Sequence, residues 1–203
     1  MRTGPKYKIC RRLGEGVYEQ CQTPKFQISK SKKVGKKPRK FSRQKTEYGV
    51  QLLEKQKTRF TYGVTDRQLS NYVGRAREGK KPPLGALYQM LERRLDNVVL
   101  KLGLAPTRAA ARQMVSHGHV TVNGKRMSIP SYEVVLGDRV AIREASRAKL
   151  FSDTAKERME SLRTPSWLLR AEDTGGKVVR LPEEPEGEFV ADLSRVLEFY
   201  SRV

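Results

Sequence analysis

Cations and amides recur at helical spacing in the middle of the chain, between Leu91 and Arg143. Arg94 and Lys101 are seven residues apart, about two helical turns, and Asn97 lies between them. On one helix, two cations and an amide at this spacing can face consecutive phosphates. We therefore interpret the stretch as a module that grips folded RNA.

A second group of donors lies on the next predicted helix. Arg108 and Arg112 are four residues apart on one edge, in register with Ser116 one turn further on, and so form a donor-rich ridge. Two arginines on a helix edge are also compatible with a plain solvated surface. The pattern alone leaves both interpretations open.

Two predicted helices must position these side chains. The first carries one apolar stripe at helical spacing, which must pack on another apolar surface: Leu84, Leu87, Tyr88, Leu91, Leu95, Val98, Val99 and Leu102. Arg94 and Lys101 lie off this stripe, and Gly103 ends the helix. The second helix is capped by the hydroxyl of Thr107 and runs through Val115.

A hairpin and a further strand follow these helices. Apolar and polar residues alternate over 120–122, and Asn123-Gly124 supplies the two residues that tolerate positive φ in a type I′ turn. Lys125-Arg126 begins the return strand, so the tip of the hairpin is basic. A second turn at Gly137-Asp138 leads to a strand over 140–142. The pattern predicts a small sheet packed on two helices.

The module contains a series of short motifs, which are Leu91, Leu95-Asp96-Asn97-Val98-Val99, Thr107-Arg108, Ala111-Arg112-Gln113, Val115-Ser116-His117 and Val122-Asn123-Gly124. Together they closely resemble the small RNA-binding domain of the small-subunit ribosomal protein four family. The same domain occurs in pseudouridine synthases, a ribosome-associated heat-shock protein and tyrosyl-tRNA synthetases. The resemblance therefore implies RNA contact without fixing a biological role.

Spacing and resemblance together assign RNA contact to one set of residues in this module: Arg94, Asn97, Lys101, Thr107, Arg108, Arg112, Gln113, Ser116, His117, Asn123, Lys125 and Arg126. His117 and His119 flank Gly118 where a helix gives way to a strand. A histidine there is more often a phosphate contact or a helix-end cation than a general base.

Composition points to a polyanionic partner. The 203 residues include 42 Lys and Arg against 22 Asp and Glu, for a net charge of +20 and a pI of about 10.2. Nucleic acid is the default partner for such a charge, and we expect RNA rather than DNA. We expect no membrane association, because no apolar run approaches the roughly 20 residues that span a bilayer and no signal-type region follows the basic N-terminus.

The N-terminal part reads as a basic arm. We expect Met1 to Gln20 to be irregular, and between Gln20 and Thr46 there are ten cations and no carboxylate. Low hydrophobicity with dense like charge predicts disorder until phosphates neutralise it. A localisation signal or a solubilising tail is the alternative. The RNA contacts expected here are Lys32, Lys33, Lys36, Lys37, Arg39, Lys40, Arg43 and Lys45.

Two cysteines, Cys10 and Cys21, are present. They are too few for a disulfide framework in a chain of this size, which fits a reducing compartment. Some members of the resembled family hold zinc with four cysteines near the N-terminus, but a closed zinc site needs four ligands. The histidines, His117 and His119, lie in the other domain. We expect neither a metal nor a cofactor.

A helical block precedes the module. It comprises a helix from Thr46 to Tyr62, ended by Gly63, and a second helix that opens with a capping box at Thr65-Asp66-Arg67-Gln68. Tyr48-Gly49-Val50-Gln51-Leu52, Glu54-Lys55-Gln56-Lys57 and Tyr62-Gly63-Val64 resemble the helical domain of bacterial-type members of the same family.

On this block we expect Lys55, Lys57 and Arg59 to contact RNA. One departure from the family concerns a Pro-Gly-Gln-His-Gly loop that many bacterial members carry just before the block. Here the corresponding stretch reads Ser31-Lys32-Lys33-Val34-Gly35, which puts the contacts of that loop in doubt.

The sequence pattern beyond the module predicts an amphipathic helix over 150–163. A strand, a turn and a second strand are expected around Asp173-Thr174-Gly175-Gly176. Trp167 is expected in the core rather than stacked on a base. One acidic patch, made of Glu183, Glu184, Glu186 and Glu188, should face solvent or a basic protein neighbour. A last helix is expected to bury Leu193, Val196, Leu197 and Tyr200, and the resemblance implies that it packs on the helical block.

These observations favour an α+β fold, in which a helical domain built from both chain ends holds an inserted module of two helices and a small sheet. The expected parts are an arm (1–45), a helical domain (46–83, completed by 190–203), the RNA-binding module (84–145) and an extension (146–189). We find no convincing catalytic constellation. Alternatives are an RNA-modifying or ribosome-rescue factor with the same module, and a generic RNA chaperone.

The resemblance implies a structural protein of the small ribosomal subunit, of bacterial or organellar type. It would bind 16S-type ribosomal RNA in the 5′ domain, nucleate assembly of the subunit body and influence decoding accuracy. Its implied protein partners are small-subunit proteins five and twelve.

Overall fold

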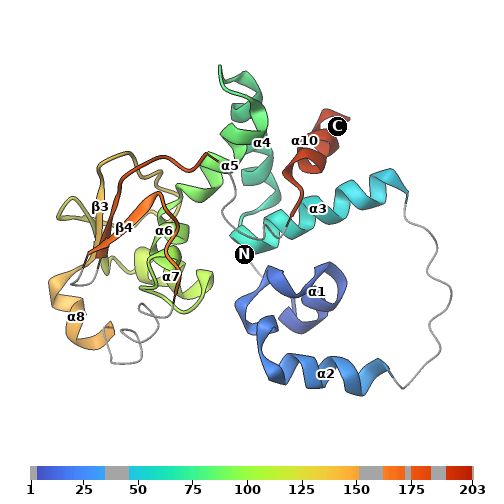
Figure 1. Cartoon of the computed structure of the whole chain (residues 1–203), viewed down its shortest axis with the longest axis horizontal. Coiled ribbons are helices and arrows are strands. Elements are labelled where there is room, and N and C mark those ends of the chain that lie inside the picture. The colour runs from blue at the N-terminus through green and yellow to red at the C-terminus, as the bar shows by residue number, and fades with distance from the viewer. Residues whose placement is uncertain (1–3, 35–45, 151–161, 172–174, 184–190, 203) are drawn as a thin grey trace. The chain divides into compact units, whose positions relative to one another are not determined.

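The chain forms two compact units. The computed structural model describes residues 4–34, 46–150, 162–171, 175–183 and 191–202, with the backbone alone at 30, 32–34 and 148–150 (Figure 1). Unit 1 comprises Met1–Leu84 and Gly187–Val203, and unit 2 comprises Gly85–Glu186. The predicted α+β class is confirmed, with a helical unit formed by both chain ends and an inserted unit that contains the sheet.

Unit 1 is helical. Its elements are α1 (Lys6–Leu13), the 3-10 helices η1 (Glu15–Val17) and η2 (Glu19–Gln22), α2 (Pro24–Val34), α3 (Glu47–Tyr62), α4 (Asp66–Glu78) and α10 (Leu193–Ser201). The expectation of an irregular segment up to Gln20 is therefore wrong, and part of the basic stretch beyond it is helical. The side chains of Cys10, Leu13 and Phe26 are buried. Tertiary packing, which local periodicity does not reveal, stabilises these short helices.

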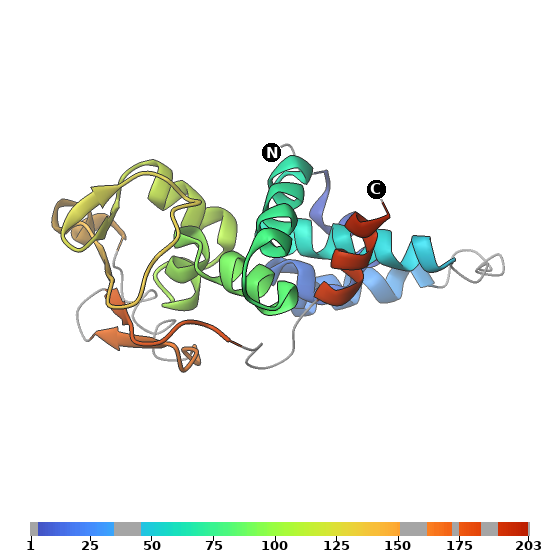
Figure 2. The same ribbon diagram turned by 90° about the horizontal axis from the view of Figure 1, so that it is seen from above.

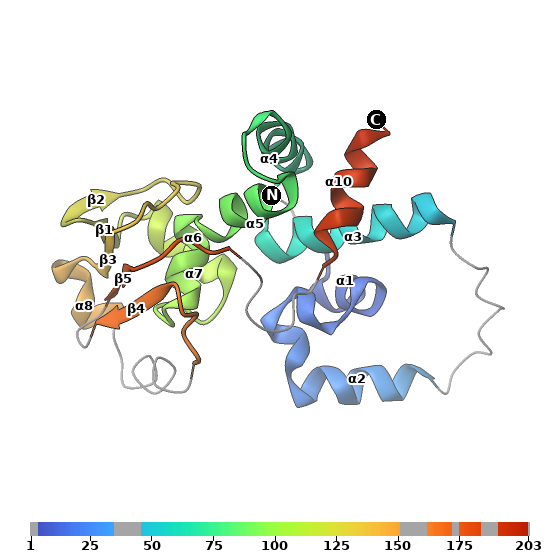
Figure 3. The ribbon, with the colours of Figure 1, turned by 45° about the horizontal axis from the view of Figure 1, so that its top comes forward.

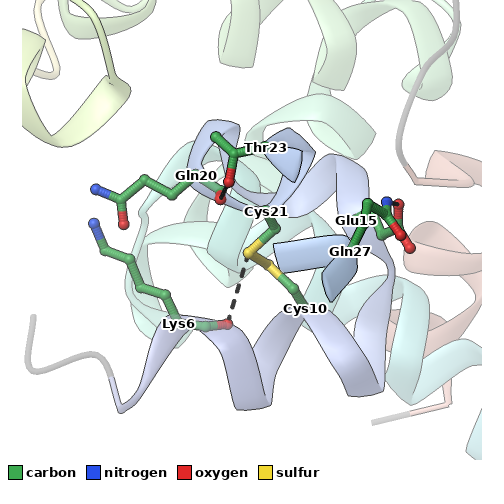
Figure 4. The surroundings of a disulfide bond; sticks show 7 residues. All are labelled: Lys6, Cys10, Glu15, Gln20, Cys21, Thr23 and Gln27. Atoms are coloured by element: carbon green, nitrogen blue, oxygen red, sulfur yellow. Dashed lines mark hydrogen bonds between the residues drawn. A yellow bond between two sulfur atoms is a disulfide. The ribbon is translucent and has the colours of Figure 1, made fainter. Parts of the chain in front are cut away.

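Cys10 and Cys21 form a disulfide (Figure 4). Their Cα atoms are 6.4 Å apart, and both side chains are buried in a small cluster with Phe26, against which Tyr7 and Tyr18 pack. Two cysteines are too few for a disulfide framework, yet the turn through η1 and η2 brings Cys21 back beside Cys10 of α1. One bridge thus closes the N-terminal segment on itself.

The block of α3 and α4 forms as predicted. The Thr46 hydroxyl accepts a hydrogen bond from the Gly49 amide, and Gly63 ends α3 at a φ of 61°. Thr65 and Gln68 form the complete capping box at the start of α4. The predicted apolar face of α4 is buried, through Leu69, Tyr72, Val73 and Ala76.

The C-terminal helix α10 crosses α3, as Figure 2 shows. Gln51 of α3 donates a hydrogen bond to the Glu198 carboxylate at 3.0 Å, and Arg77 of α4 donates to the carbonyl oxygens of Leu197 and Tyr200. Leu193 and Val196 are buried as expected, but Phe199 replaces Leu197 and Tyr200, which are half-buried, as the third core residue of α10.

Unit 2 packs helices on one five-stranded sheet (Figure 3). Its elements are α5 (Pro83–Glu92), α6 (Leu95–Lys101), α7 (Arg108–Ser116), β1 (Val120–Val122), β2 (Lys125–Met127), β3 (Arg139–Ile142), α8 (Glu144–Leu150), β4 (Leu168–Ala171) and β5 (Gly175–Val178). All neighbouring strands are antiparallel, in the order β2-β1-β3-β5-β4. The strands expected as a separate extension therefore continue the sheet of the module.

The single long helix expected over 84–102 is broken at Arg93 and Arg94. Arg94 has an extended backbone, with φ −60° and ψ 133°, and pairs with Glu133 in an isolated β-bridge. The amide of Leu95 donates to the carbonyl oxygen of Tyr132 at 2.8 Å. The amides of Leu95 and Asp96 thus donate to carbonyl oxygens of the segment before β3 instead of to α5, so α5 ends and α6 starts in a new direction.

The core of unit 2 lies between the sheet and helices α6 and α7. Trp167 is 2% exposed and belongs to this core, as predicted. Asn123 and Gly124 have φ values of 51° and 77°, which confirms the predicted hairpin turn. Most of the helix expected over 150–163 lies outside the described residues. Among the described residues, no helix is both long and apolar enough to cross a membrane.

Candidate nucleic-acid interface

A buried carboxylate organises the arginines of the predicted ridge. Asp96 is fully buried at the start of α6. Arg94 donates to both of its oxygens, at 3.1 and 2.8 Å, and Arg112 of α7 donates to Oδ2 from Nε and Nη2, at 3.0 and 2.6 Å. Such bidentate, charge-assisted pairs fix the plane of each guanidinium. Asp96 therefore joins the two helices.

The next residue, Asn97, holds the second arginine of α7. Asn97 is fully buried and donates through Nδ2 to the backbone oxygen and the carboxylate of Glu92, both at 3.0 Å. Its Oδ1 accepts from Arg108 Nη2 at 2.8 Å. Lys101 Nζ stands 4.0 Å from the same Glu92 carboxylate. The network spans α5, α6 and α7.

Two of the predicted contact residues are therefore not on the surface. Arg94 is 2% exposed and Asn97 is fully buried, so the expected row of Arg94, Asn97 and Lys101 over consecutive phosphates is wrong. The missed signal was the pair Glu92 and Asp96, two acids four residues apart beside an apolar stripe. Buried carboxylates require cations, and here they take nearby arginines.

Arg108 and Arg112 remain half-buried, so the network holds each guanidinium while the side chain stays partly exposed. The other predicted residues of α7 and the hairpin are surface groups with different roles. Thr107 caps α7 by accepting from the Ala110 amide. Gln113, Ser116, His117, Lys125 and Arg126 are exposed.

Asn123 holds the hairpin in place. Its Nδ2 donates to the buried Asp138 carboxylate at 2.7 Å, and its Oδ1 accepts from the Arg139 amide at 2.9 Å. Both functional atoms of this side chain are therefore used inside the protein. A contact from Asn123 to RNA would compete with the bonds that fix the turn.

Unit 1 departs from the sequence prediction at Lys55. This residue is 7% exposed, pairs with Asp66 at 2.9 Å and lies over the rings of Phe199 and Tyr200. Burial, reinforced by the nearby Asp66 charge, raises the pKa of Tyr200 to about 12. Lys55 thus anchors α10 to α3 and is buried away from a phosphate.

Lys57 is half-buried and pairs with Glu54 at 2.7 Å. Arg59 stacks 4.6 Å from the Phe60 ring and lines a largely apolar hollow between α1 and α3. Burial also raises the pKa of Tyr18, and the nearby positive charge of Arg59 opposes this rise. Among the arm residues, the side chains of Lys32 and Lys33 are not described, and Lys36, Lys37, Arg39, Lys40, Arg43 and Lys45 lie outside the described residues.

Comparison with known proteins decides the family. Residues 1–101 match the family described as ribosomal protein S4/S9 N-terminal domain, and residues 93–140 match the S4 domain. The chain is 44% identical to small ribosomal subunit protein uS4 of Aquifex aeolicus, over 98% of each chain. The chain belongs to the uS4 family.

Other uS4 relatives show the same extent of similarity. The identity is 45% to the protein of Latilactobacillus sakei and 41% to that of Roseiflexus sp., in each case over 98% of both chains. Because these matches span both units, the similarity is not confined to the widely shared RNA-binding domain.

Proposed function

We propose that this protein is a structural constituent of the small ribosomal subunit that binds 16S-type ribosomal RNA. It contacts the 5′ domain and nucleates assembly of the subunit body. The observation that carries the proposal is the pair of anchored arginines, Arg108 and Arg112, on a chain of net charge +20 with full-length likeness to uS4 proteins.

The buried network explains how the ridge recognises RNA shape. Asp96 and Asn97 hold Arg112 and Arg108 before RNA arrives, so little side-chain freedom remains to be lost on binding. A guanidinium whose plane is fixed in this way is already oriented for a phosphate. Folded RNA with phosphates at the matching spacing is thereby preferred over a flexible strand.

The same interpretation accounts for the rest of the chain. The basic segment around residues 36–45 adds affinity that does not depend on sequence, and the acidic stretch, of which Glu183 is described, faces a basic protein neighbour. Small-subunit proteins five and twelve are the proposed protein partners, through which the protein influences decoding accuracy. No catalytic step is assigned to the protein.

RNA capture tests the proposal. The purified full-length chain is mixed with total RNA, washed at high salt, and the bound RNA is sequenced. Enrichment of the 16S 5′ domain is expected. Equal recovery of transfer RNA, messenger RNA and ribosomal RNA would instead support a generic RNA chaperone, and enrichment of another ribosomal segment would support a modifying or rescue factor.

A matched pair of variants tests the ridge. Arg108→Gln keeps a donor for Asn97 but loses the charge, and Lys80→Gln removes a charge from the exposed linker before α5. Loss of one phosphate contact reduces the slope of log K against log salt by about 0.7 to 0.9. We expect this reduction for Arg108→Gln alone. Equal slopes in the two variants would exclude the ridge from the interface.

A further inference from the structure

The sheet of unit 2 has a second face that the α6–α7 ridge does not use. Val120 and Val122 of β1, with Val140 and Ile142 of β3, are buried against the helices. Successive side chains of a strand point to opposite sides, so the residues between them face away from α6 and α7. We call this side the outer face.

Strand register places several cations on the outer face. Thr121 of β1 is paired with Arg126 of β2 and with Ala141 of β3, and Arg139 is paired with Lys177 of β5. Residues paired directly across an antiparallel ladder share a side, and Arg143 follows at the same period. The exposed cations of the outer face are Arg126, Arg139, Arg143 and Lys177.

The outer face is hollowed beside the start of α8. A hollow of about 760 Å³ lies over Thr121 and Ala141, and its rim includes Arg139, Arg143 and Arg147. One carboxylate, Glu144, also lines it. Within the described part of the chain, none of the three arginines forms an ion pair, in contrast to Arg94 and Arg112 on the helix side.

Arg126 shows how this face is built. Its side chain lies over Gly118, where an added Cβ would come within 2.1 Å of the guanidinium, and Nη2 donates to the His117 carbonyl oxygen at 3.4 Å. A glycine with φ of 73° therefore leaves room for the arginine to cross from β2 to the end of α7. This contact fixes the guanidinium beside the end of α7.

We propose that the outer face is a second phosphate-binding surface, which takes the backbone of an RNA segment different from the one on the α6–α7 ridge. Several exposed cations for which the described residues supply no carboxylate partner fit a polyanion. The exposed groups that gather on this face are cations, so the ligand is the sugar-phosphate backbone. Unit 2 then holds two RNA segments on opposite sides of one sheet.

The inference goes beyond the proposed function, because it concerns a second RNA segment whichever RNA occupies the ridge. A capture assay with two RNAs tests it. The full-length protein is bound to an immobilised fragment of the 16S 5′ domain, and a labelled RNA duplex of arbitrary sequence is added as the probe. The complex is expected to retain the probe, with a strong dependence on salt.

The variant Arg139→Gln/Arg143→Gln is compared with Lys80→Gln/Arg180→Gln, which removes two exposed charges elsewhere. For two lost contacts we expect the salt slope of probe binding to fall by between about one and two. Binding of the immobilised fragment should change no more than in the control. Unchanged probe binding would overturn the proposal, and equal loss of both RNAs would show one continuous site instead of two.

Thermal unfolding of each variant accompanies the assay. If Arg139→Gln/Arg143→Gln unfolds, Arg147→Gln on α8 serves instead, with the slope expected to fall by about 0.7 to 0.9 for one contact. If the immobilised 16S fragment fails to bind the unmodified protein, the proposed function fails. The duplex probe alone, added to free protein, then still tests the outer face, and no difference from the control variant would overturn it.

Discussion

The core of unit 2 and the N-terminal segment of unit 1 are stabilised in different ways. Seventeen buried apolar residues from helices and strands form one cluster in unit 2. In the N-terminal segment the corresponding cluster holds three residues, Cys10, Cys21 and Phe26, and two of these are joined covalently. The larger core is continuous, whereas the smaller one depends on a cross-link.

The difference explains where charge is buried. A large core can enclose Asp96 because its two arginines and the surrounding packing offset the cost of desolvation. The N-terminal segment buries no comparable ion pair among its described residues. Unit 2 thus combines rigidity with fixed charges, which suits a shape-reading surface, and the segment around α1 is stabilised as a short closed loop.

The largest effect that would sharpen this comparison is expected at Asp96. Asp96→Ala removes the carboxylate that faces two guanidinium groups, and breaking a buried pair costs about 3 to 5 kcal/mol. Glu47→Ala is the control, because Glu47 pairs with Arg202 at 2.9 Å and both side chains are exposed, at 70% and 52%. Exposed pairs contribute about 0 to 1 kcal/mol.

Urea unfolding of both variants, followed by hydrogen exchange to locate the change, measures this prediction. We expect the loss in Asp96→Ala to appear at α6 and α7. Similar stabilities for the Asp96 and Glu47 variants would mean that burial of the network contributes little, and the contrast between the two regions would no longer hold.

The next effect concerns the disulfide. Cys10 and Cys21 are 11 residues apart, and cross-linking a loop near this length stabilises by about 3 kcal/mol in the chain-entropy treatment. Cys10→Ala/Cys21→Ala should destabilise the N-terminal segment by this order, with faster hydrogen exchange in α1 and α2. Unit 2 should be unaffected.

Reduction of the unmodified protein is the matched control, because it breaks the bond and keeps both sulfur atoms in the core. Reductant should reproduce most of the loss of stability in the unmodified protein. It should leave the stability of the double alanine variant unchanged. A segment that stays protected after reduction would show that packing alone holds it, as in unit 2.

A smaller effect is expected at Arg77, which donates to the last carbonyl oxygens of α10. Arg77→Met removes these bonds and keeps much of the aliphatic stem, for an expected loss of about 0.5 to 1.5 kcal/mol. Arg67→Met changes another exposed cation of α4 and should stay within about 0.5 kcal/mol of the unmodified protein. Limited proteolysis at the C-terminus distinguishes the two variants, because a loosened α10 is cleaved faster. Equal cleavage rates in Arg77→Met and Arg67→Met would show that α10 does not depend on Arg77.

The elements that sequence reasoning predicted well are those with local causes. The capping box at Thr65 and Gln68, the turn at Asn123-Gly124 and the buried stripe of α4 each depend on a few neighbouring residues. What it missed depends on distant partners. Arg93 and Arg94 leave the helical path because residues 130–134 bond to that backbone, and no periodicity near Arg94 records this.

The functional residues show the same division between local causes and distant partners. Helical spacing placed Arg108 and Arg112 on α7, but whether an arginine reaches solvent depends on which carboxylate lies beside it. Arg94 was therefore misassigned, and Lys177 of the outer face was overlooked because β5 joins β3 from a segment that was expected to be separate. Long-range strand pairing decided both outcomes.

The smallest effect that we predict is a pH dependence in unit 1. The folded pKa of Tyr200, about 12, lies above its ordinary value of 10.0, so the folded state retains a proton that the unfolded chain releases first. The stability from this group is complete below pH 10 and is lost as pH rises toward 12. Tyr200→Phe should reduce the loss of stability over this window, measured by urea unfolding at stepped pH.

The same variant should be close to neutral at pH 7. The Tyr200 hydroxyl is buried and has no hydrogen-bond partner among the described residues, so its removal leaves none of them unsatisfied, and the ring that faces Lys55 is retained. Burial also raises the pKa of Tyr18, so part of the alkaline loss should persist until Tyr18→Phe is added. An unchanged pH profile in the double variant would mean that the buried phenols do not set the alkaline limit of unit 1.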